Sequence, residues 1–429
     1  MRHILRWTTA STIVAAMSGV VPTAMPVQAA GALPDPPSAV TSTDYPNDGT
    51  FHGEAGRTGF FTIHAPLTDP ASVTSYLVGL DGANQPTAAT EVPAVGDDHQ
   101  ATIAITPTIG PHDLFVWSRN SAGISDPEFI YHFLVRRGSG PAANWLMDEG
   151  TGTTLSDATV HGNTATLGGQ PVWTSGPVGY GAAVTLNGGV HQATTVGPIT
   201  TTNPDSGAFE ALRTDRSFSV TAWVRLTDAE ESHAAVSVDG VRNSAFVLGY
   251  SRDANRWALT VPGADRDGAT AVRALSSEPP QLGAWTHLTG TFDLATSQLA
   301  LYVDGSREGQ TTSPTPWNAA GGARIGAAER EGEIAKHWHG DVDEVAVWDR
   351  LLFPGEAAAL ATAPKLAGQW PLDAGAGTVA ADTSGVMPAH PGTLVGGTSW
   401  TTINPDDARP FDGGLPNSAV AVAFDGPLA

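Results

Sequence analysis

The stretch FSVTAWVRL, residues 218–226, carries the pattern that decides the fold. Every second residue in it is apolar, from Phe218 to Leu226. Successive side chains of a β-strand point to opposite faces of the sheet, so all of these apolar residues share one face. WTHLTGTFD (285–293) and SQLALYVDG (297–305) repeat the alternation, and the second ends in an Asp-Gly turn typical of hairpins. The three stretches predict strands with one buried face.

The composition supports a protein made almost entirely of short strands. The 429 residues include 49 glycines and 32 prolines, and only 15% are charged. Such a chain is rich in turns and poor in long helices. One short helix is predicted in LLFPGEAAALATA (351–363), beginning near Pro354. The expected fold class is all-β.

The N-terminus predicts export from the cell. Arg2 and Arg6 precede an apolar run at about residues 10–21, and Val27-Gln28-Ala29 has the small residues of a signal-peptidase site. The run is too short to span a bilayer, so no membrane span is expected. We therefore expect residues 1–29 to be a signal peptide and the protein to be secreted. Loss of the two arginines changes the net charge from −22 to −24.

This acidic balance and the absence of cysteine exclude several classes of function. Nucleic-acid binding needs clustered Lys and Arg, so no nucleic-acid partner is expected. A chain with no cysteine has no disulfides, no thiolate zinc site and no cysteine nucleophile. The acidity suits either a solvated surface or the binding of divalent cations.

Proline-rich residues 30–37 form a linker, and residues 38–137 read as a first sandwich domain. ATIAITP (101–107) and FIYHFLV (129–135) are strand-like runs with turn signals between them. With SYLVGLDG and HDLFVWSRNSAG, their pattern resembles a bacterial fibronectin-III or immunoglobulin-like module.

Residues 142–364 carry a more specific resemblance. The segments occur in the following order: Trp145-Leu-Met-Asp148, the Asp157 loop, FSVTAWV, WTHLTGTFD, LALYVDG, ARIG and GDVDEVAVWDRLLFPGEAAAL. This ordered set resembles the laminin-G-like jelly-roll family of the concanavalin A-like superfamily. The resemblance implies two antiparallel sheets packed face to face, with function at the sheet ends and the concave face.

The opening of this domain returns near the end of the chain. NWLMDEGTGTTLSDATVHGNTATL (144–167) is similar to QWPLDAGAGTVAADTSGVMPAHPGTL (369–394). Residues 367–429 therefore read as a truncated second laminin-G-like repeat. The opening strands of a sandwich cannot bury their apolar face alone, so this segment is expected to be disordered, to pair with another module or to belong to a longer chain.

The family resemblance raises the question of a calcium ion near a sheet edge. Calcium takes six to eight oxygen ligands, and the candidate ligands are Asp157, Asp341 and Asp343. Asp341 and Asp343 are two residues apart, so both side chains leave one face of their strand. The alternative is that the aspartates only anchor loop amides.

Aromatic and polar residues on predicted loops are candidates for ligand binding. Rings stack on sugar faces, and Asn and Arg bind hydroxyl groups; the candidates are Tyr250, Asn255, Arg256, Trp257 and Trp317. The alternative is that the aromatic residues pack inside the sandwich. His337 and His339 flank Trp338 with spacing that could suit zinc, but two further ligands are lacking, so exposed histidines beside a core tryptophan are favoured.

The sequence indicates no enzyme. Glycoside hydrolases need two carboxylates across a cleft, and DVDEV lacks the Glu-x-Asp-x-Glu register of glucanases. The leading hypothesis is a secreted, non-catalytic binding or adhesion protein whose partner is an extracellular glycan or protein. The alternatives are the binding arm of a longer extracellular glycoside hydrolase and a structural surface repeat.

Overall fold

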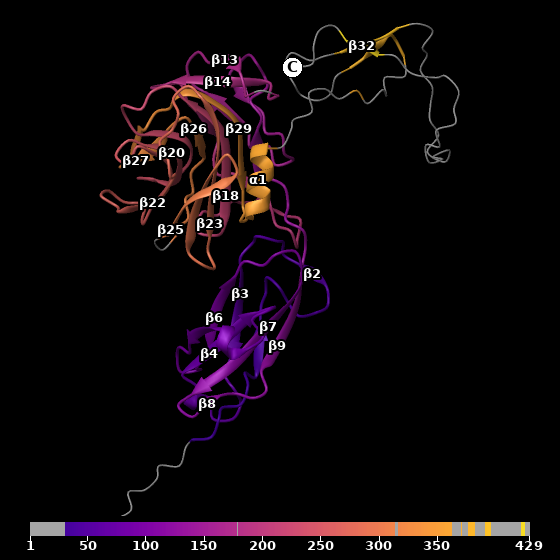
Figure 1. The fold of residues 1–429 in the computed structure, drawn as a ribbon, viewed down its shortest axis with the longest axis vertical. Helices are drawn as coiled ribbons and strands as arrows, with labels where there is room; N and C mark the ends of the chain where they lie inside the picture. Colours follow the sequence, from indigo (N-terminus) through magenta and orange to yellow (C-terminus); the bar gives the residue numbers. More distant parts are fainter. Residues whose placement is uncertain are drawn as a thin grey trace, which may run out of the picture.

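The structure, a computed structural model, describes residues 31–177, 179–313, 316–362, 370, 376–381, 391–395 and 422–424. The predicted signal peptide and most of the predicted second repeat lie outside the described residues. Two β-sandwich domains follow one another along the chain (Figure 1). The expected all-β class is confirmed. No helix in the described ranges is long and apolar enough to cross a membrane.

The N-terminal domain consists of two facing sheets. The first has the order β1 (Ala39–Thr41), β3 (Gly59–His64) and β6 (Ala101–Ile105). The second has the order β2 (Phe51–His52), β9 (Phe129–Val135), β7 (Gly110–Asn120), β4 (Ser75–Leu80) and β5 (Thr90–Pro93), with β8 (Gly123–Ile124) paired to β7. Short 3₁₀ turns occupy Pro70–Ser72 and Pro86–Ala88. Alternate residues such as Leu114 and Val116 are fully buried between the sheets. The immunoglobulin or fibronectin-III assignment of this domain stays a prediction.

The central domain is a sandwich of two larger sheets. One sheet has the order β13 (Val172–Ser175), β14 (Ala182–Asn187), β29 (His339–Trp348), β18 (Phe218–Leu226), β23 (Trp285–Asp293), β24 (Gln298–Val303) and β25 (Ser306–Thr312), with β10 (Ala143–Trp145) paired to β29. The facing sheet has the order β11 (Thr154–Leu155), β12 (Ala165–Leu167), β15 (Ala193–Thr195), β26 (Ala323–Ile325), β19 (His233–Asp239), β20 (Ser244–Ser251), β21 (Arg256–Pro262) and β22 (Ala271–Leu275). Two small hairpins flank them, β16 (Thr200–Thr202) with β17 (Phe209–Ala211), and β27 (Ala328–Arg330) with β28 (Glu333–Ala335).

The core of the central domain follows the alternation seen in the sequence. Val220, Ala222 and Val224 of β18 are fully buried, and Phe218 stacks on Phe246 of the facing sheet at 4.6 Å between ring centroids. Strands β18 and β23 have the limits that the pattern predicts. Each deeply buried aliphatic or aromatic side chain contributes roughly 1.5–3 kcal/mol relative to an exposed one, which is why the alternation determines the layers.

One outer face of the sandwich is covered by the helix. α1 (Pro354–Thr362) places Ala357 against Ala300 and Tyr302 of β24. The Glu356 carboxylate accepts a hydrogen bond from the Phe353 amide at 2.9 Å, which satisfies a free donor at the start of the helix. The outer face of the other sheet, formed by β19 to β22, lies on the side of the domain away from α1 (Figure 1).

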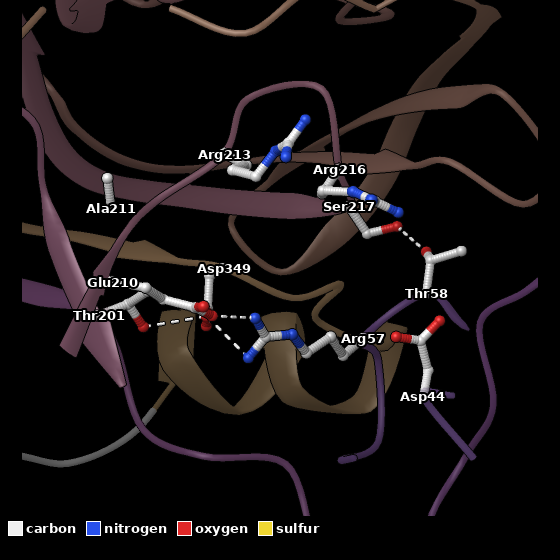
Figure 2. A pocket seen from close by; sticks show the side chains of 10 residues that line it. All are labelled: Asp44, Arg57, Thr58, Thr201, Glu210, Ala211, Arg213, Arg216, Ser217 and Asp349. Carbon is white, nitrogen blue, oxygen red and sulfur yellow. Dashed lines mark hydrogen bonds and ion pairs between the residues drawn. The ribbon is translucent and has the colours of Figure 1, made fainter. Parts of the chain in front are cut away.

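The two domains meet through charged and polar side chains. The Arg57 guanidinium pairs with the Glu210 carboxylate, and its Nη1 lies 3.4 Å from Asp349 Oδ2 (Figure 2). The hydroxyl oxygens of Thr58 and Ser217 are 2.5 Å apart. These contacts join a loop of the N-terminal domain to three separate segments of the central domain, so the junction has a defined geometry.

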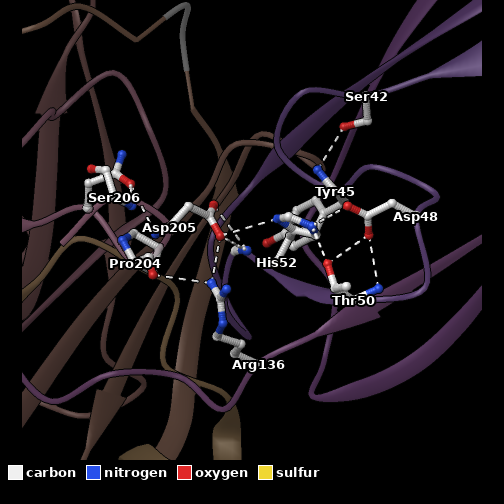
Figure 3. A network of polar contacts seen from close by, with 11 residues as sticks. Ser42, Tyr45, Asp48, Thr50, His52, Arg136, Pro204, Asp205 and Ser206 are labelled. Atoms are coloured by element: carbon white, nitrogen blue, oxygen red, sulfur yellow. Dashed lines mark hydrogen bonds and ion pairs between the residues drawn. The ribbon is translucent and has the colours of Figure 1, made fainter.

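A second network surrounds Asp205. Its carboxylate accepts hydrogen bonds from Arg136 Nη1 at 2.6 Å and the Gly53 amide at 3.1 Å, and lies 3.5 Å from His52 Nδ1 (Figure 3). Close backbone approach completes the junction at Gly56, whose carbonyl accepts the Leu351 amide at 2.8 Å. Gly56 has φ +84°, and a Cβ there would lie 2.2 Å from the Leu351 carbonyl oxygen, so glycine is required.

The described strands near the C-terminus form a hairpin like that of β11 and β12 in the central domain. β30 (Val379–Ala380) pairs with β31 (Gly392–Leu394), and β32 (Val422–Phe424) pairs with β31. Thr154 and Val379 each stand nine residues after the tryptophan that opens their repeat, and Thr166 and Thr393 each precede its last leucine. Thr154 is directly opposite Thr166 in the first hairpin, as Val379 is opposite Thr393 in the second. The second hairpin thus has the register of the first.

Candidate functional site

The structure buries two of the predicted ligand residues in the core. Tyr250 is 5% exposed and Trp257 is 2% exposed. Both belong to the apolar cluster between the sheets, and Trp257 stacks on Trp338. Neither ring is presented on the surface for stacking, so their predicted role as sugar platforms is wrong. The alternation of Phe246, Leu248 and Tyr250 along β20 is the sequence signal that places Tyr250 inside.

The other predicted ligand residues lie apart from one another. Asn255 occupies the turn between β20 and β21, and its Oδ1 accepts the Tyr250 hydroxyl at 2.9 Å. Arg256 Nε donates to the Ser277 carbonyl at 3.1 Å. Trp317 is half-buried against the core and donates to the Pro262 carbonyl at 2.9 Å. These contacts stabilise turns and loops, and the five residues do not form one site.

Asp157 anchors a loop. Its carboxylate accepts hydrogen bonds from the backbone amides of Asn144, Thr159 and Asn163 at 2.7–3.0 Å. Burial opposes the charge, but these donors outweigh it and lower the pKa of Asp157. The oxygens that a cation would use are already directed to the backbone.

Asp341 and Asp343 share the outer face of β29, as their spacing predicts, but Asp157 does not join them. Asp341 pairs with Arg225 Nε at 2.5 Å and accepts the Thr185 hydroxyl at 2.5 Å. Asp157 lies beside Asn144, which opposes Ala346 on β29. At ~3.3 Å per residue, Ala346 is roughly 10 Å along the strand from Asp343 and roughly 16 Å from Asp341.

These residues do not fit a calcium ion. In the described ranges, no group of three or more His, Asp and Glu side chains is placed to hold a metal. The predicted ligands are separated, and Asp341 is neutralised by an arginine, whereas calcium needs several converging oxygens. The predicted calcium site is therefore not formed by these three aspartates. His337 and His339 likewise gain no metal-binding partners here, and Trp338 between them is fully buried.

The structure reveals a groove that the sequence did not indicate. It runs over the outer face of the β19–β22 sheet and has a volume of about 660 Å³. The β27–β28 hairpin forms one wall, because Ala328 packs on Ala234 and Val247 at the side of the groove. Residues 269–271, which lead into β22, form the opposite wall. A volume of this size falls within the usual range for ligand sites.

The floor of the groove is made of small side chains in register. Gly249 of β20 opposes Ala258 of β21, and in the next row Val247, Thr260 and Arg273 follow one another across β20, β21 and β22. Gly249 is required here, because a Cβ would lie 2.1 Å from the His233 carbonyl oxygen. The remaining lining is largely polar and includes the hydroxyl groups of Ser232, Ser244, Ser251 and Thr270.

Charged groups of both signs line the groove. Four cationic side chains line it: Arg252, Arg273, Arg330 and Lys336. Three acidic side chains also line it: Glu231, Asp253 and Glu329. Burial lowers the pKa of Lys336 to about 8, and the neighbouring charges of Arg273 and Arg330 act in the same direction. The groove lining therefore carries one more cationic than acidic side chain on a strongly acidic protein.

A second cavity lies between the domains. It has a volume of about 230 Å³ and is lined by arginine and acidic residues around Arg57 (Figure 2). Its other arginines are engaged: Arg213 binds the Asp215 carboxylate at 2.5 Å, and the Arg216 guanidinium lies 4.6 Å from the Phe60 ring centroid. These groups satisfy one another, so the cavity is part of the domain junction.

Comparisons with known proteins agree with this fold. Residues 197–358 match the family model of the concanavalin A-like lectin/glucanases superfamily, so the central domain, a jelly-roll sandwich, is similar to this superfamily in sequence. No curated protein matches the chain.

Solved structures show weaker likeness. Domain 4 of an extracellular arabinanase from Geobacillus stearothermophilus, solved with arabinotriose, is 16% identical with a TM-score of 0.40, over 52% of this chain and 100% of that domain. The receptor-binding domain of botulinum neurotoxin type G is 12% identical with a TM-score of 0.38, over 60% of this chain and 63% of that one. The chain thus spans less than two thirds of the neurotoxin domain. None of these similarities is strong enough to indicate a ligand.

Proposed function

We propose that this protein is a secreted, non-catalytic binding protein whose jelly-roll domain holds an extracellular glycan in the groove over β19 to β22. The groove itself carries the proposal. It crosses four strands above a floor of the small residues Gly249, Ala258 and Thr260. Ala258 is 3% and Thr260 8% exposed, so a ligand would contact mainly the side chains of the walls. Its walls offer hydroxyl, amide and charged groups that can bind sugar hydroxyls.

The rest of the molecule fits a role in presentation. The N-terminal domain is fixed to the central domain through Arg57 and Asp205 on a side of the jelly roll whose residues do not line the groove. It can therefore hold the groove at a defined distance from whatever surface the N-terminus faces. The predicted signal peptide would deliver both domains to the outside of the cell.

The test is a glycan array with the full mature chain and a variant that fills the groove. Thr260→Trp places an indole on the groove floor, and the matched Thr312→Trp places one on an exposed position of β25 in the other sheet. We expect Thr260→Trp to lose at least ~10-fold in affinity for the best glycan, and Thr312→Trp to bind like the wild type. Equal binding by all three proteins would refute the groove as the site.

A second assay addresses the absence of catalysis. The wild-type protein is incubated with the glycan that it binds, and newly formed reducing ends are measured. We expect none above the buffer control. Reducing ends that disappear in Thr260→Trp would make the groove an active site and overturn the non-catalytic part of the proposal.

A further inference from the structure

Three cationic side chains that line the groove, Arg273, Arg330 and Lys336, lie near enough for the two arginines to lower the pKa of the lysine. Arg273 comes from β22, Arg330 from β27 and Lys336 from the end of the β27–β28 hairpin. Eight other arginines in the described ranges form ion pairs with Asp or Glu, but these three side chains form none. Six further arginines in the described ranges also form no ion pair, so what sets these three cations apart is that they line one groove together.

Two of the three acids that line the groove have other charged or titratable neighbours than the three cations. Glu329 is close to Asp239 and Asp265, which together with burial raise its pKa. The negative charge of Glu231 acts to raise the pKa of His233, against the larger opposite effect of burial. The charges that affect the pKa of Lys336 are those of Arg273 and Arg330. Arg330 lies opposite Glu333 across the β27–β28 hairpin but forms no ion pair with it.

The described groove also lacks an exposed aromatic platform. Tyr250 is the one tyrosine, tryptophan or phenylalanine that lines it, and this ring is 5% exposed with its hydroxyl bound to Asn255. Neutral sugars are commonly held by stacking of a CH face on a ring. Recognition in this groove must instead rely on hydrogen bonds and charge, and ammonium and guanidinium groups bind anionic oxygens strongly in partly desolvated sites.

We infer that the groove is selective for an acidic glycan, whose carboxylate or sulfate groups are bound by Lys336, Arg273 and Arg330. This inference rests on the proposed function and adds the chemical class of its ligand. The anion would replace the missing acidic partners of the three cations. The sugar rings that carry it would lie between the walls of the groove, above Gly249 and Ala258.

The test compares charged and neutral forms of the same saccharides. The probes are oligogalacturonate, oligoglucuronate and oligomannuronate hexamers, each with its methyl ester, and a sulfated hexamer with its desulfated form. Dissociation constants are measured by calorimetry with the full mature chain. We expect at least one acidic probe to bind ~10-fold or more tightly than its neutral counterpart. The carboxylate and sulfate sets distinguish the source of the charge.

Variants locate this selectivity. Lys336→Met and Arg273→Gln are each expected to weaken binding of the acidic probe about tenfold and binding of its neutral form much less, so that the preference for the acidic probe is lost. Arg307→Gln, at an exposed position of β25, is the matched control and should not alter either. Melting temperatures of all variants confirm that they are folded.

The pH profile gives a readout specific to Lys336. Between pH 7 and 9.5 the surrounding His233 stays neutral because burial lowers its pKa, and Tyr250 stays neutral because burial raises its pKa. Lys336 loses its proton as the pH rises through about 8. Affinity for the acidic probe should fall across this interval in the wild type and stay flat in Lys336→Met.

Each result decides between the two proposals. If acidic and neutral probes bind equally and Thr260→Trp abolishes both, the groove binds glycans and the inference of acidic selectivity is wrong. If acidic probes are preferred but Lys336→Met and Arg273→Gln do not change the preference, these cations are not its source and the inference is also wrong. If no probe and no array glycan binds, both proposals fail.

Discussion

Replacing Arg57 with methionine should weaken the junction between the two sandwich domains. Methionine keeps most of the aliphatic length of the side chain and removes the guanidinium that faces Glu210 and Asp349. The Asp349 side chain is 7% exposed, and Glu54 nearby is 3% exposed. Burial raises the pKa of Glu54, and the negative charge of Asp349 adds to this effect, whereas Arg57 opposes it. The substitution leaves two buried carboxylates without their cation.

The magnitude follows from burial. Removing one partner of a fully buried ion pair costs about 3–5 kcal/mol. Arg57 is 27% and Glu210 is 37% exposed, so water screens part of this interaction, and about 2–3 kcal/mol is the reasonable expectation. For domains of this size that corresponds to a fall in Tm of roughly 5–10 °C.

Differential scanning calorimetry of the full mature chain measures the effect against a surface ion pair. Arg119 Nη1 lies 2.7 Å from Glu91, with side chains 41% and 48% exposed, so Arg119→Met should cost less than about 1 kcal/mol. Adding Asp349→Asn to Arg57→Met should restore part of the loss, because it removes one stranded charge. The reasoning is refuted if Arg57→Met is no more destabilising than Arg119→Met.

The remaining predictions concern single positions in the central domain. Trp257→Ala should destabilise the domain by about 3–5 kcal/mol in urea unfolding, because it empties a core position, and a stable variant that only loses ligand affinity would contradict its burial. Asp157→Ala should lower the free energy of unfolding by about 1–3 kcal/mol, because three backbone amides lose their acceptor. The loss should be the same in calcium and in EDTA. If calcium stabilises the wild type and not the variant, Asp157 does bind a metal. Burial lowers the pKa of His287 from 6.5 to about 4, so the unfolded chain binds a proton before the folded chain does as the pH falls from 6.5 to 4. The free energy of unfolding should therefore drop by up to roughly 3 kcal/mol over that interval. A His287→Phe variant should show a shallower drop.

The layers of the fold could be read from the sequence because side-chain alternation directly reports burial. FSVTAWVRL and WTHLTGTFD are strands with the predicted limits, and α1 begins at Pro354 as the proline predicts. The same rule places Trp257 with Leu259 on the inner face of β21. Trp257 was expected on a loop because its ring can stack on a sugar, but the alternation of side chains along β21 already predicts that it is buried.

The groove could not be predicted in this way, because it depends on which residues of β20, β21 and β22 stand opposite one another. Gly249, Ala258 and Thr260 are unremarkable in sequence, and they form a floor only because β20 and β21 pair with Gly249 opposite Ala258. Lys336 reaches the groove from a hairpin more than sixty residues beyond Arg273. The absence of ion-pair partners for these cations is visible only once every nearby carboxylate has been placed.

The aspartates show the opposite case, in which the sequence offered two interpretations and the structure distinguishes them. The spacing of Asp341 and Asp343 correctly predicts one shared face, but spacing carries no information on the distance to Asp157. Pairing of β10 with β29 sets that distance, since it aligns Asn144 with Ala346. The loop-anchor interpretation of Asp157 agrees with its hydrogen bonds.

The central claim is that the groove over β19 to β22 is the ligand site, and a crystal structure of the full mature chain with a bound acidic hexasaccharide tests it most directly. The account predicts sugar rings over Gly249 and Ala258, with a carboxylate or sulfate within hydrogen-bond distance of Lys336 and Arg273. A saccharide bound instead at the outer face of β29, or in the cavity beside Arg57, would contradict it.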